Sequence, residues 1–324
     1  MSTRVPFDQR RVIDSRRLRQ RQHVHAAITA VAGFGGVLAA VWLAVFVHPP
    51  SIFDWLLLGC FYLPIQLGVT AGLHRHFSHR SFCATRKVRQ VLAALGSMAG
   101  QGPVVFWVSL HRLHHELSDR SGDPHSPNLA GSGRLARLRG IVHAYVGWTV
   151  KHEVPNANHY ARDLLREASI MSINRTYYYW VALGLLLPSG IAGLVLRTWT
   201  GVAEGLIWGG LVRMFLGHNM IWWITSFAHV IGTREFDSKD RSTNNRWLAL
   251  PTLGESWHNN HHAFPGAARL NFSTWQLDLT GLTIGLLERC GLAWNVRRPE
   301  APALAARRLT AAGARLKQAQ GPTS

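Results

Sequence analysis

Apolar residues gather in four long runs along the chain, and polar segments separate these runs. The first pair covers about residues 25–47 and 52–73, with the turn-forming sequence His48-Pro49-Pro50 between them. The second pair covers about residues 178–195 and 206–227. Each run is close to the roughly 20 residues that an apolar helix needs to cross a bilayer. The pattern predicts an all-α membrane protein with four transmembrane helices arranged in two hairpins.

A fifth apolar stretch, residues 91–110, interrupts the polar segment between the two predicted hairpins. It contains Gly96, Gly100, Gly102 and Pro103. Irregular backbone is tolerated at membrane depth only where protein or a water-filled cavity covers it. We therefore expect a re-entrant or interfacial helix in this stretch and no additional crossing.

Composition and charge support a membrane location and give an orientation. Hydrophobic residues make up 47% of the chain and charged residues only 16%, which is below the proportion of charge typical of soluble domains. The net charge is +18, and the basic residues lie mostly near the two ends and in the polar loops. Basic loops favour the cytoplasmic side, so both termini and the segment between the hairpins are expected there, with the chain integral to the inner or plasma membrane. Because the basic residues are not interleaved with aromatic ones, the lipid bilayer is the expected partner and a nucleic acid is not.

Nine of the 18 histidines fall into groups with metal-binding spacing. Two groups read His-x-x-His-His, in which all three histidines share one helix face because positions i, i+3 and i+4 are neighbours. Another pair is five residues apart, which requires a helix end that departs from α-helical geometry. The candidate ligands are His74, His79, His111, His114, His115, His229, His258, His261 and His262. All of them are expected at the cytoplasmic membrane surface, and since one metal takes about four to six ligands, nine predict a dinuclear site.

The remaining histidines are interpreted as ordinary polar residues. His76 is expected to point away from its neighbours and His125 to belong to a loop turn, while His143, His152, His159 and His218 stand alone. Imidazole binds iron, zinc, copper and nickel, so the ligand set leaves the metal open. A nitrogen-rich dinuclear site beside a membrane fits oxygen activation on a lipid substrate better than structural zinc, which is closed by four ligands.

These motifs resemble the membrane fatty-acid desaturase family, and within it the bacterial branch similar to stearoyl-CoA (delta-9 acyl-CoA) desaturases. The matching pieces are GLHRHFSHRSF (72–82), HRLHHELSDRSGDPHSP (111–127), HAYVGW (143–148), SFAHVIG (226–232) and GESWHNNHHAFP (254–265). The resemblance implies a desaturase domain over residues 24–298, between a basic cytoplasmic segment 1–23 and a basic tail 299–324. It also implies a cytoplasmic helical cap that holds the dinuclear site.

The resemblance further implies which histidines share a metal. One iron would be held by His74, His79, His111, His115 and His261. The other would be held by His114, His229, His258 and His262, with a water completing its ligands. In such enzymes two Fe²⁺ ions use O2 to introduce a cis double bond, here expected at the delta-9 position of a long-chain acyl-CoA. Electrons would come from a separate ferredoxin or flavoprotein reductase, and no catalytic residue is expected beyond the metal ligands.

Two departures from the family pattern keep alternatives open. Leu110 stands where some acyl-CoA members carry an acidic residue, and Thr225 stands where they carry an asparagine. The substrate could instead be an acyl-carrier-protein thioester or a lipid, and the reaction an acetylenation or a hydroxylation. A membrane metal transporter is the alternative from a different class, although few ionisable residues lie within the apolar runs.

Polar and aromatic residues near the histidines are also assigned roles. Five of them are expected to orient the ligating rings, as metal-bound histidines require: Asp119, Asp123, Asn244, Glu255 and Asn259. Arg112 and Lys151 could contact a phosphorylated substrate carrier. Trp148 and Trp257 could line an acyl tunnel.

Overall fold

The computed structural model describes residues 10–310, so the predictions for residues 1–9 and 311–324 lie outside it. The helices before the second apolar pair are α1 (Arg16–Phe46), α2 (Ile52–Leu67), η1 (Gly68–Ser78), α3 (Arg86–Met98), α4 (Val104–Leu117), α5 (Arg134–Val142), η2 (His143–Gly147), α6 (Trp148–Lys151), α7 (Ala157–Tyr160), α8 (Arg162–Leu165) and α9 (Ala168–Arg175). Those that follow are α10 (Tyr177–Leu196), α11 (Trp199–Glu204), η3 (Gly205–Val212), α12 (Arg213–Phe227), η4 (Arg246–Leu248), α13 (His258–Ala263), α14 (Leu279–Arg289) and α15 (Ala301–Arg307). Four two-residue strands form two antiparallel pairs, β1 (Val12–Ile13) with β3 (Val154–Pro155) and β2 (Cys83–Ala84) with β4 (Ala293–Trp294).

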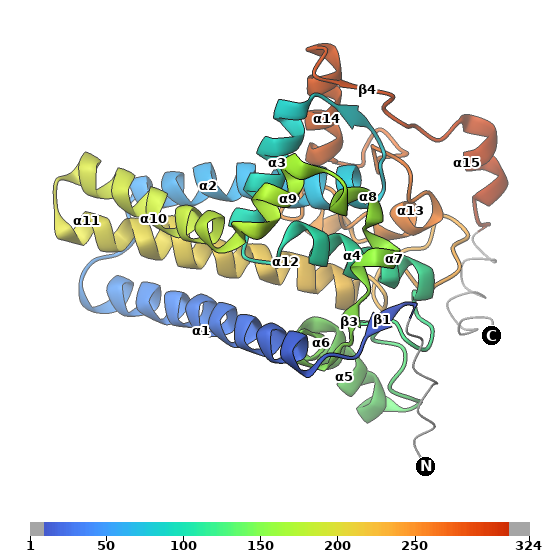
Figure 1. Ribbon diagram of the computed structural model, residues 1–324, viewed down its shortest axis with the longest axis horizontal. Helices are drawn as coiled ribbons and strands as arrows, with labels where there is room; N and C mark the ends of the chain where they lie inside the picture. The colour runs from blue at the N-terminus through green and yellow to red at the C-terminus, as the bar shows by residue number, and fades with distance from the viewer. Residues whose placement is uncertain (1–9, 311–324) are drawn as a thin grey trace.

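Three helices of the described chain are long and apolar enough to cross a membrane: α1, α2 continued by η1, and α10. They run roughly along the long axis of the molecule (Figure 1), and η3 contacts all three of them. Their apolar side chains are exposed where soluble proteins would bury them; Val31 is 74% and Leu194 80% exposed. Such surfaces suit contact with lipid. The predicted all-helical architecture and three of the four predicted spans therefore have a structural counterpart.

The segment of the fourth predicted span is helical but is not one uniform α-helix. It consists of α11, η3 and α12 in succession, and it carries the buried residues Glu204 and Arg213. Arg213 donates hydrogen bonds to the backbone oxygens of Met98 and Gly184 on two neighbouring helices. The buried guanidinium is thus satisfied within the bundle, whereas the crossing itself stays a prediction.

The Gly-rich apolar stretch forms two helices joined by a tight turn. α3 ends at Met98 and α4 begins at Val104, while Gly100 and Gly102 between them have φ angles of +76° and +109°. Side chains rarely tolerate this region of backbone space, which explains the glycines. The turn brings the chain back toward the histidine motifs, and the stretch forms two helices in place of the single one expected.

The helix α1 begins before the apolar run that predicted it. Ser15 accepts a hydrogen bond from the backbone of Leu18 and so caps the helix at Arg16. Residues 16–23 are therefore the first turns of α1 and belong structurally to the helix.

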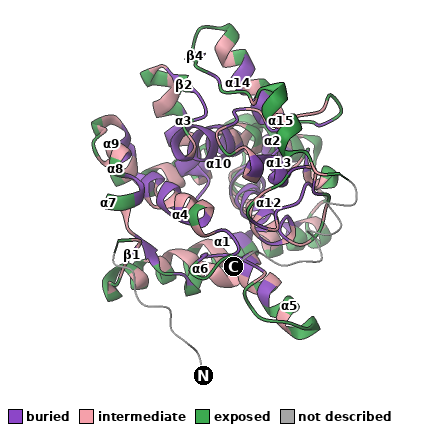
Figure 2. Cartoon of the chain, turned by 90° about the vertical axis from the view of Figure 1, so that its right-hand side faces the viewer, coloured by how far each residue is buried: buried purple, intermediate pink, exposed green. Residues whose placement is uncertain are grey.

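The remaining short helices form a cap at one end of the long bundle (Figure 1). The main hydrophobic core joins η1, α3 and α4 to α9 and α14, with Val69, Ala93, Val108, Ile170 and Ile284 completely buried. Seen end-on, buried residues gather around the middle, near α4, α12 and α13 (Figure 2). The candidate ligands lie on η1, α4 and α13 and directly after α12.

Candidate metal centre

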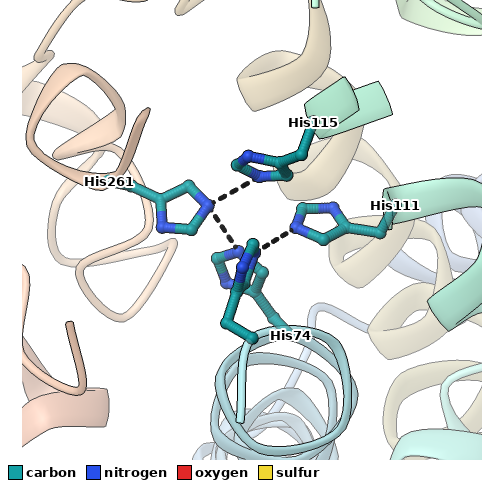
Figure 3. Close-up of side chains that lie close together, drawn as sticks. His74, His111, His115 and His261 are labelled. Atoms are coloured by element: carbon teal, nitrogen blue, oxygen red, sulfur yellow. Dashed lines mark hydrogen bonds between the residues drawn. The ribbon is translucent and has the colours of Figure 1, made fainter. Parts of the chain in front are cut away.

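Five histidines from three separate segments meet in a first group. Figure 3 shows His74, His111, His115 and His261 with their rings directed toward one another. The Nε2 atom of His261 lies 3.0 Å from that of His74 and 2.9 Å from that of His115. His79 completes the group, with its Nε2 atom 2.7 Å from that of His111. Two nitrogens at right angles around one metal are about 3.0 Å apart when each bond is about 2.1 Å, so these separations suit a shared ion.

Four further histidines form a second group, composed of His114, His229, His258 and His262. The Nε2 atoms of His229 and His258 are 3.0 Å apart. The two groups adjoin, because the ring of His262 stacks on that of His115 with centroids 4.5 Å apart. The structure thus brings all nine predicted ligands together, in the two sets that the family resemblance implied.

The helix α4 carries ligands for both groups. His111 and His115 are one turn apart and join the first group, while His114 joins the second. The helix α13 divides its three histidines between the groups in a similar way. Spacing of i, i+3 and i+4 covers an arc of one helix face, which is wide enough to address two neighbouring centres.

The pair His74 and His79 depends on the π-helix η1. The backbone N–H of His79 donates to the carbonyl oxygen of His74, five residues earlier, at 3.2 Å. On an α-helix these side chains would point about 140° apart. The wider π turn brings their rings to within 5.0 Å of each other, and π turns are frequent at functional sites.

Carboxylates lie against the Nδ1 atoms of four of the nine rings, three of them as hydrogen-bond acceptors and Glu255 as a close ion-pair contact. The pairs are His74 with Glu255 at 2.6 Å, His114 with Asp123 at 2.9 Å, His229 with Asp119 at 3.0 Å, and His262 with Asp240. Such contacts fix the ring and direct Nε2 toward a metal. Asp240 was missed from the sequence, because it lies 22 residues before His262 in a polar loop without a motif.

A buried ion-pair network supports the first group from behind. Arg75 of η1 is 1% exposed, and it donates to Glu255 at 3.0 Å and to Asp278 at 2.8 and 2.9 Å. Asp278 in turn caps α14 by accepting from Gly281. Glu255 therefore connects a histidine of the centre to the start of α14 in the cap.

Electrostatics keep most of these imidazoles in the neutral form that binds metal. Burial, reinforced by neighbouring histidines, holds the pKa of His111, His115, His258 and His261 well below the usual value. At His229 burial also acts to lower the pKa, but Asp119 and further carboxylates outweigh it and raise the pKa to about 9. A bound cation would replace that proton and gain the same attraction.

Unpaired nitrogens indicate that the residues present fit a metal. The Nε2 atoms of His114 and His262 are buried and have no hydrogen-bond partner among the described residues. Leaving such atoms unsatisfied is costly, and both belong to the second group, where a metal would satisfy them. The donor set is entirely nitrogen in both groups, with carboxylates only behind the rings.

The two predicted orienting asparagines lie elsewhere than expected. Asn244 accepts from the backbone of Asn260 and donates to its side chain, which braces α13. Asn259 accepts from the backbone of Glu235 and Phe236. Both asparagines hold backbone segments in place, and their hydrogen-bond partners among the described residues are not histidine rings.

Arg112, which was expected to contact the substrate carrier, is engaged inside the protein instead. Arg112 donates to the carbonyl oxygens of Phe77, Ser78 and Tyr160 and pairs with Asp163 at 2.9 Å. These contacts occupy its guanidinium, so it is placed as a structural residue and not as a phosphate contact.

Of the other residues expected to contact the substrate, Trp257 is buried in the core, Trp148 lines the cavity and Lys151 is exposed. Trp257 is 2% exposed, donates to the carbonyl oxygen of Leu277 and lies in a core cluster away from the cavity. Trp148 lines the cavity beside the histidines, and Lys151 is exposed at the end of the same short helix α6.

The histidines set aside from the sequence also have defined places. His76 contacts the carbonyl oxygen of Phe82 and accepts from Arg89, away from both groups. His125 lies closer than expected, because its ring centroid is 4.1 Å from that of His114. It could form a further group with His114 and Asp123, and no sequence spacing indicated this.

A cavity opens directly beside the two groups. His74, His111, His114 and His258 form part of its wall. Val69, Leu110, Ile221 and Ile224 contribute apolar surface from η1, α4 and α12. An apolar cavity with polar groups at a few points is the usual form of a small-molecule site, and an acyl chain suits this wall.

The fold and this centre define a helical protein with membrane-spanning candidates and paired histidine sites, and the comparisons with known proteins assign its family. The fatty acid desaturase family matches residues 49–279, and the chain belongs to that family.

The chain is 48% identical over 276 residues to the hex-5-enoyl-[acyl-carrier protein] acetylenase of Moorena producens (strain JHB), covering 85% of this chain and 86% of the relative. It is 34% identical to the sn-1 stearoyl-lipid 9-desaturase of Anabaena variabilis, with 78% and 89% covered, and 35% identical to the acyl-CoA C20 Delta5-desaturase of Anemone leveillei, with 77% of each covered. The predicted family is confirmed, and the chain is an oxidoreductase of the desaturase type.

Proposed function

We propose that this protein is a di-iron, O2-dependent enzyme that removes hydrogen from adjacent carbons of an acyl chain to form a double or triple bond. The proposal rests on one observation: a group of five histidines and a group of four lie next to each other beside a largely apolar cavity. Imidazole ligands suit iron, and two groups provide for two ions. Reducing equivalents would come from a separate ferredoxin or flavoprotein reductase.

Iron bound at the two groups would supply the oxygen activation and the removal of hydrogen from an unactivated carbon. The chain's own residues bind, orient and shield. Val69, Ile221 and Ile224 would hold the acyl chain by apolar contact and keep water away from it. Asp119, Asp123, Asp240 and Glu255 would fix the ligating rings through their Nδ1 atoms. His258 and His111 both border the cavity, so the reacting carbon would lie where the two groups adjoin.

For the carrier of the acyl chain, we propose an acyl carrier protein. The relative at 48% identity is named for this carrier, whereas those named for lipid and CoA substrates are 34% and 35% identical. A net charge of +18 favours an acidic partner. The finer expectations from the sequence, CoA as carrier and a double bond at the delta-9 position, stay predictions that the same assay tests.

The orientation in the membrane is also a proposal. The segment 206–227 would cross as the fourth helix, with both termini and the histidine groups on the cytoplasmic side. The basic residues that precede the first apolar run, together with those in the polar loops, support this orientation. Cysteine labelling from either side of the membrane, for example at position 151 and at position 198, would test it.

The function is tested by expressing the full chain, measuring its iron content and analysing the fatty acids of the host. We expect about two iron ions per chain, as two ligand groups require, and new unsaturated products that a His114→Ala variant does not make. Purified enzyme with a ferredoxin system is then supplied with acyl-carrier-protein, CoA and lipid substrates in parallel. Hydroxy acids as sole products would contradict desaturation, and absence of iron together with absence of oxygen consumption would favour the transporter alternative.

A further inference from the structure

Outside the cluster of histidines and carboxylates, two polar atoms on the cavity wall have no hydrogen-bond partner among the described residues. The Oε1 atom of Gln22, in α1, and the Nε1 atom of Trp148, in α6, are buried and make no hydrogen bond among the described residues. Both residues line the cavity that contains the histidine centre. Buried polar atoms are normally paired, so these two call for an explanation.

The metal centre does not provide that explanation. Neither glutamine nor tryptophan belongs to the histidine groups. Gln22 is fixed through the other end of its amide, with Nε2 lying 2.6 Å from Nε2 of His152 and donating to the carbonyl oxygen of Thr149 at 3.5 Å. This arrangement leaves Oε1 as the atom without a partner.

The two residues lie close to each other and to the second histidine group. The ring of Trp148 is 5.5 Å from that of His152, the partner of Gln22, and 5.5 Å from that of His125. His125 is in turn 4.1 Å from His114 of the second group, between ring centroids. The unpaired atoms therefore occupy a wall position a few side chains from the proposed site of reaction.

The chemistry of the pair is specific. An indole N–H can only donate and a carboxamide oxygen can only accept. A thioester carried on phosphopantetheine offers the matching groups in sequence, a carbonyl oxygen that accepts and, two carbons beyond the sulfur, an amide N–H that donates. A glycerolipid ester has the carbonyl but no such amide.

We propose that Trp148 and Gln22 form a subsite for the polar head of the substrate, in which Trp148 Nε1 donates to the thioester carbonyl and Gln22 Oε1 accepts from the first pantetheine amide. This assignment rests on the proposed acyl-thioester function and extends it. It places the thioester inside the cavity, near the second histidine group, and it selects phosphopantetheine carriers over membrane lipids. Both an acyl carrier protein and CoA present this group.

The test uses the full-length iron-loaded enzyme and two small thioesters of the acyl chain that fatty-acid analysis identifies. One is the N-acetylcysteamine thioester, which has the carbonyl and the amide; the other is the S-ethyl thioester, which has only the carbonyl. Trp148→Phe should raise KM for both by roughly three- to ten-fold with little change in kcat, as the loss of one neutral hydrogen bond predicts. Gln22→Leu should raise KM by a similar factor only for the N-acetylcysteamine thioester.

A matched control is provided by Trp208→Phe. The Nε1 atom of Trp208 is also buried without a hydrogen-bond partner in residues 10–310, but this residue does not line the cavity. The control should leave KM for both thioesters unchanged. A purely structural role for Trp148 or Gln22 would alter kcat or stability without distinguishing the two thioesters.

The outcomes separate the two proposals. If wild-type enzyme converts the thioesters but the variants show no KM change, or Gln22→Leu affects both thioesters equally, the subsite is wrong and the function stands. If wild-type enzyme converts no thioester and acts on a lipid, the proposed carrier and this subsite fall together. Parallel assays with acyl carrier protein and CoA substrates identify the natural carrier, and both should depend on Gln22.

Discussion

The two histidine groups use the same ligand atom in different electrostatic surroundings. In the first group a single carboxylate, Glu255, contacts a ligating ring, and Arg75 shares that carboxylate. In the second group three carboxylates, Asp119, Asp123 and Asp240, each contact a different ring. The second group therefore has three carboxylates behind four nitrogens, whereas the first has one carboxylate behind five. Two ions of the same metal can thus be bound with different affinities because of residues that do not contact the metal.

The largest expected effect is the loss of a ligand. His262→Ala removes one of four nitrogens from the second group, so that group should lose its iron while the five-histidine group keeps its own. Product formation should fall to background, and the iron content should fall by about half, as the loss of one of two sites requires. Metal analysis and Mössbauer spectroscopy of the purified variant would measure this.

The control for this change is His159→Ala, since His159 is exposed and belongs to neither group. It should retain iron and activity. Complete loss of iron from His262→Ala would show that the two groups bind cooperatively and would break the proposed independence.

Removal of the metal is the next largest effect. A chelator that strips the iron should lower the melting temperature of the detergent-solubilised protein, because a ligand that binds only the folded state stabilises it. The nine converging imidazoles would then be left without their partner. Thermal unfolding with and without chelator measures the shift, and His262→Ala should show a smaller one; an equal shift in both would argue against a contribution from the second group.

Neutralising a carboxylate should give an intermediate effect that sharpens the contrast between the groups. Asp240→Asn and Glu255→Gln should each weaken iron binding at their own group by roughly 10- to 100-fold. Only Glu255→Gln should also destabilise the fold, because it removes a negative charge that pairs with the buried Arg75. Iron titration and unfolding, run on both variants, separate the two effects, and a fold destabilised equally by both changes would contradict this.

The smallest effect is expected away from both groups, at the pair formed by Arg112 and Asp163. Burial acts to raise the pKa of Asp163, but Arg112 and Arg80 outweigh it and lower the pKa to about 2. Because the folded-state pKa is depressed, the stabilisation is present above pH 4 or so and is lost as the pH falls toward the folded pKa. Asp163→Asn should cost roughly 0.2–1 kcal/mol near neutral pH, the range for partly exposed pairs, and should remove that acid-dependent loss. Unfolding measured from pH 7 to pH 3 would show it, and an unchanged acid dependence in the variant would rule it out.

What the sequence predicted well is what local periodicity encodes. The His-x-x-His-His spacing places its residues on one helix face whatever the surroundings, so the contributions of α4 and α13 followed from spacing alone. The apolar runs likewise predicted α1 and α10 because length and hydrophobicity are local properties.

What the sequence did not predict depends on contacts between distant segments. Arg112 looked like a free cation, but its partners are backbone oxygens 34 to 48 residues away. Asp240 carries no motif, and its importance arises only from the loop that brings it to His262. Asn244 stood close to the motifs, yet it braces the backbone of α13, which no residue type alone could reveal.

The π-helical turn of η1 places His79 in the first group, so the position of this ligand depends on the backbone conformation as well as on the residue type. The five-residue interval from His74 has one residue more than an α-helical turn would place on that face. A single-residue deletion between them would allow an ordinary, more regular helix and would rotate every later side chain by about 100°. The site would then lose a ligand although every histidine of the motif was still present. In this part of the molecule, the number of residues between the two histidines is therefore as important for function as the histidines themselves.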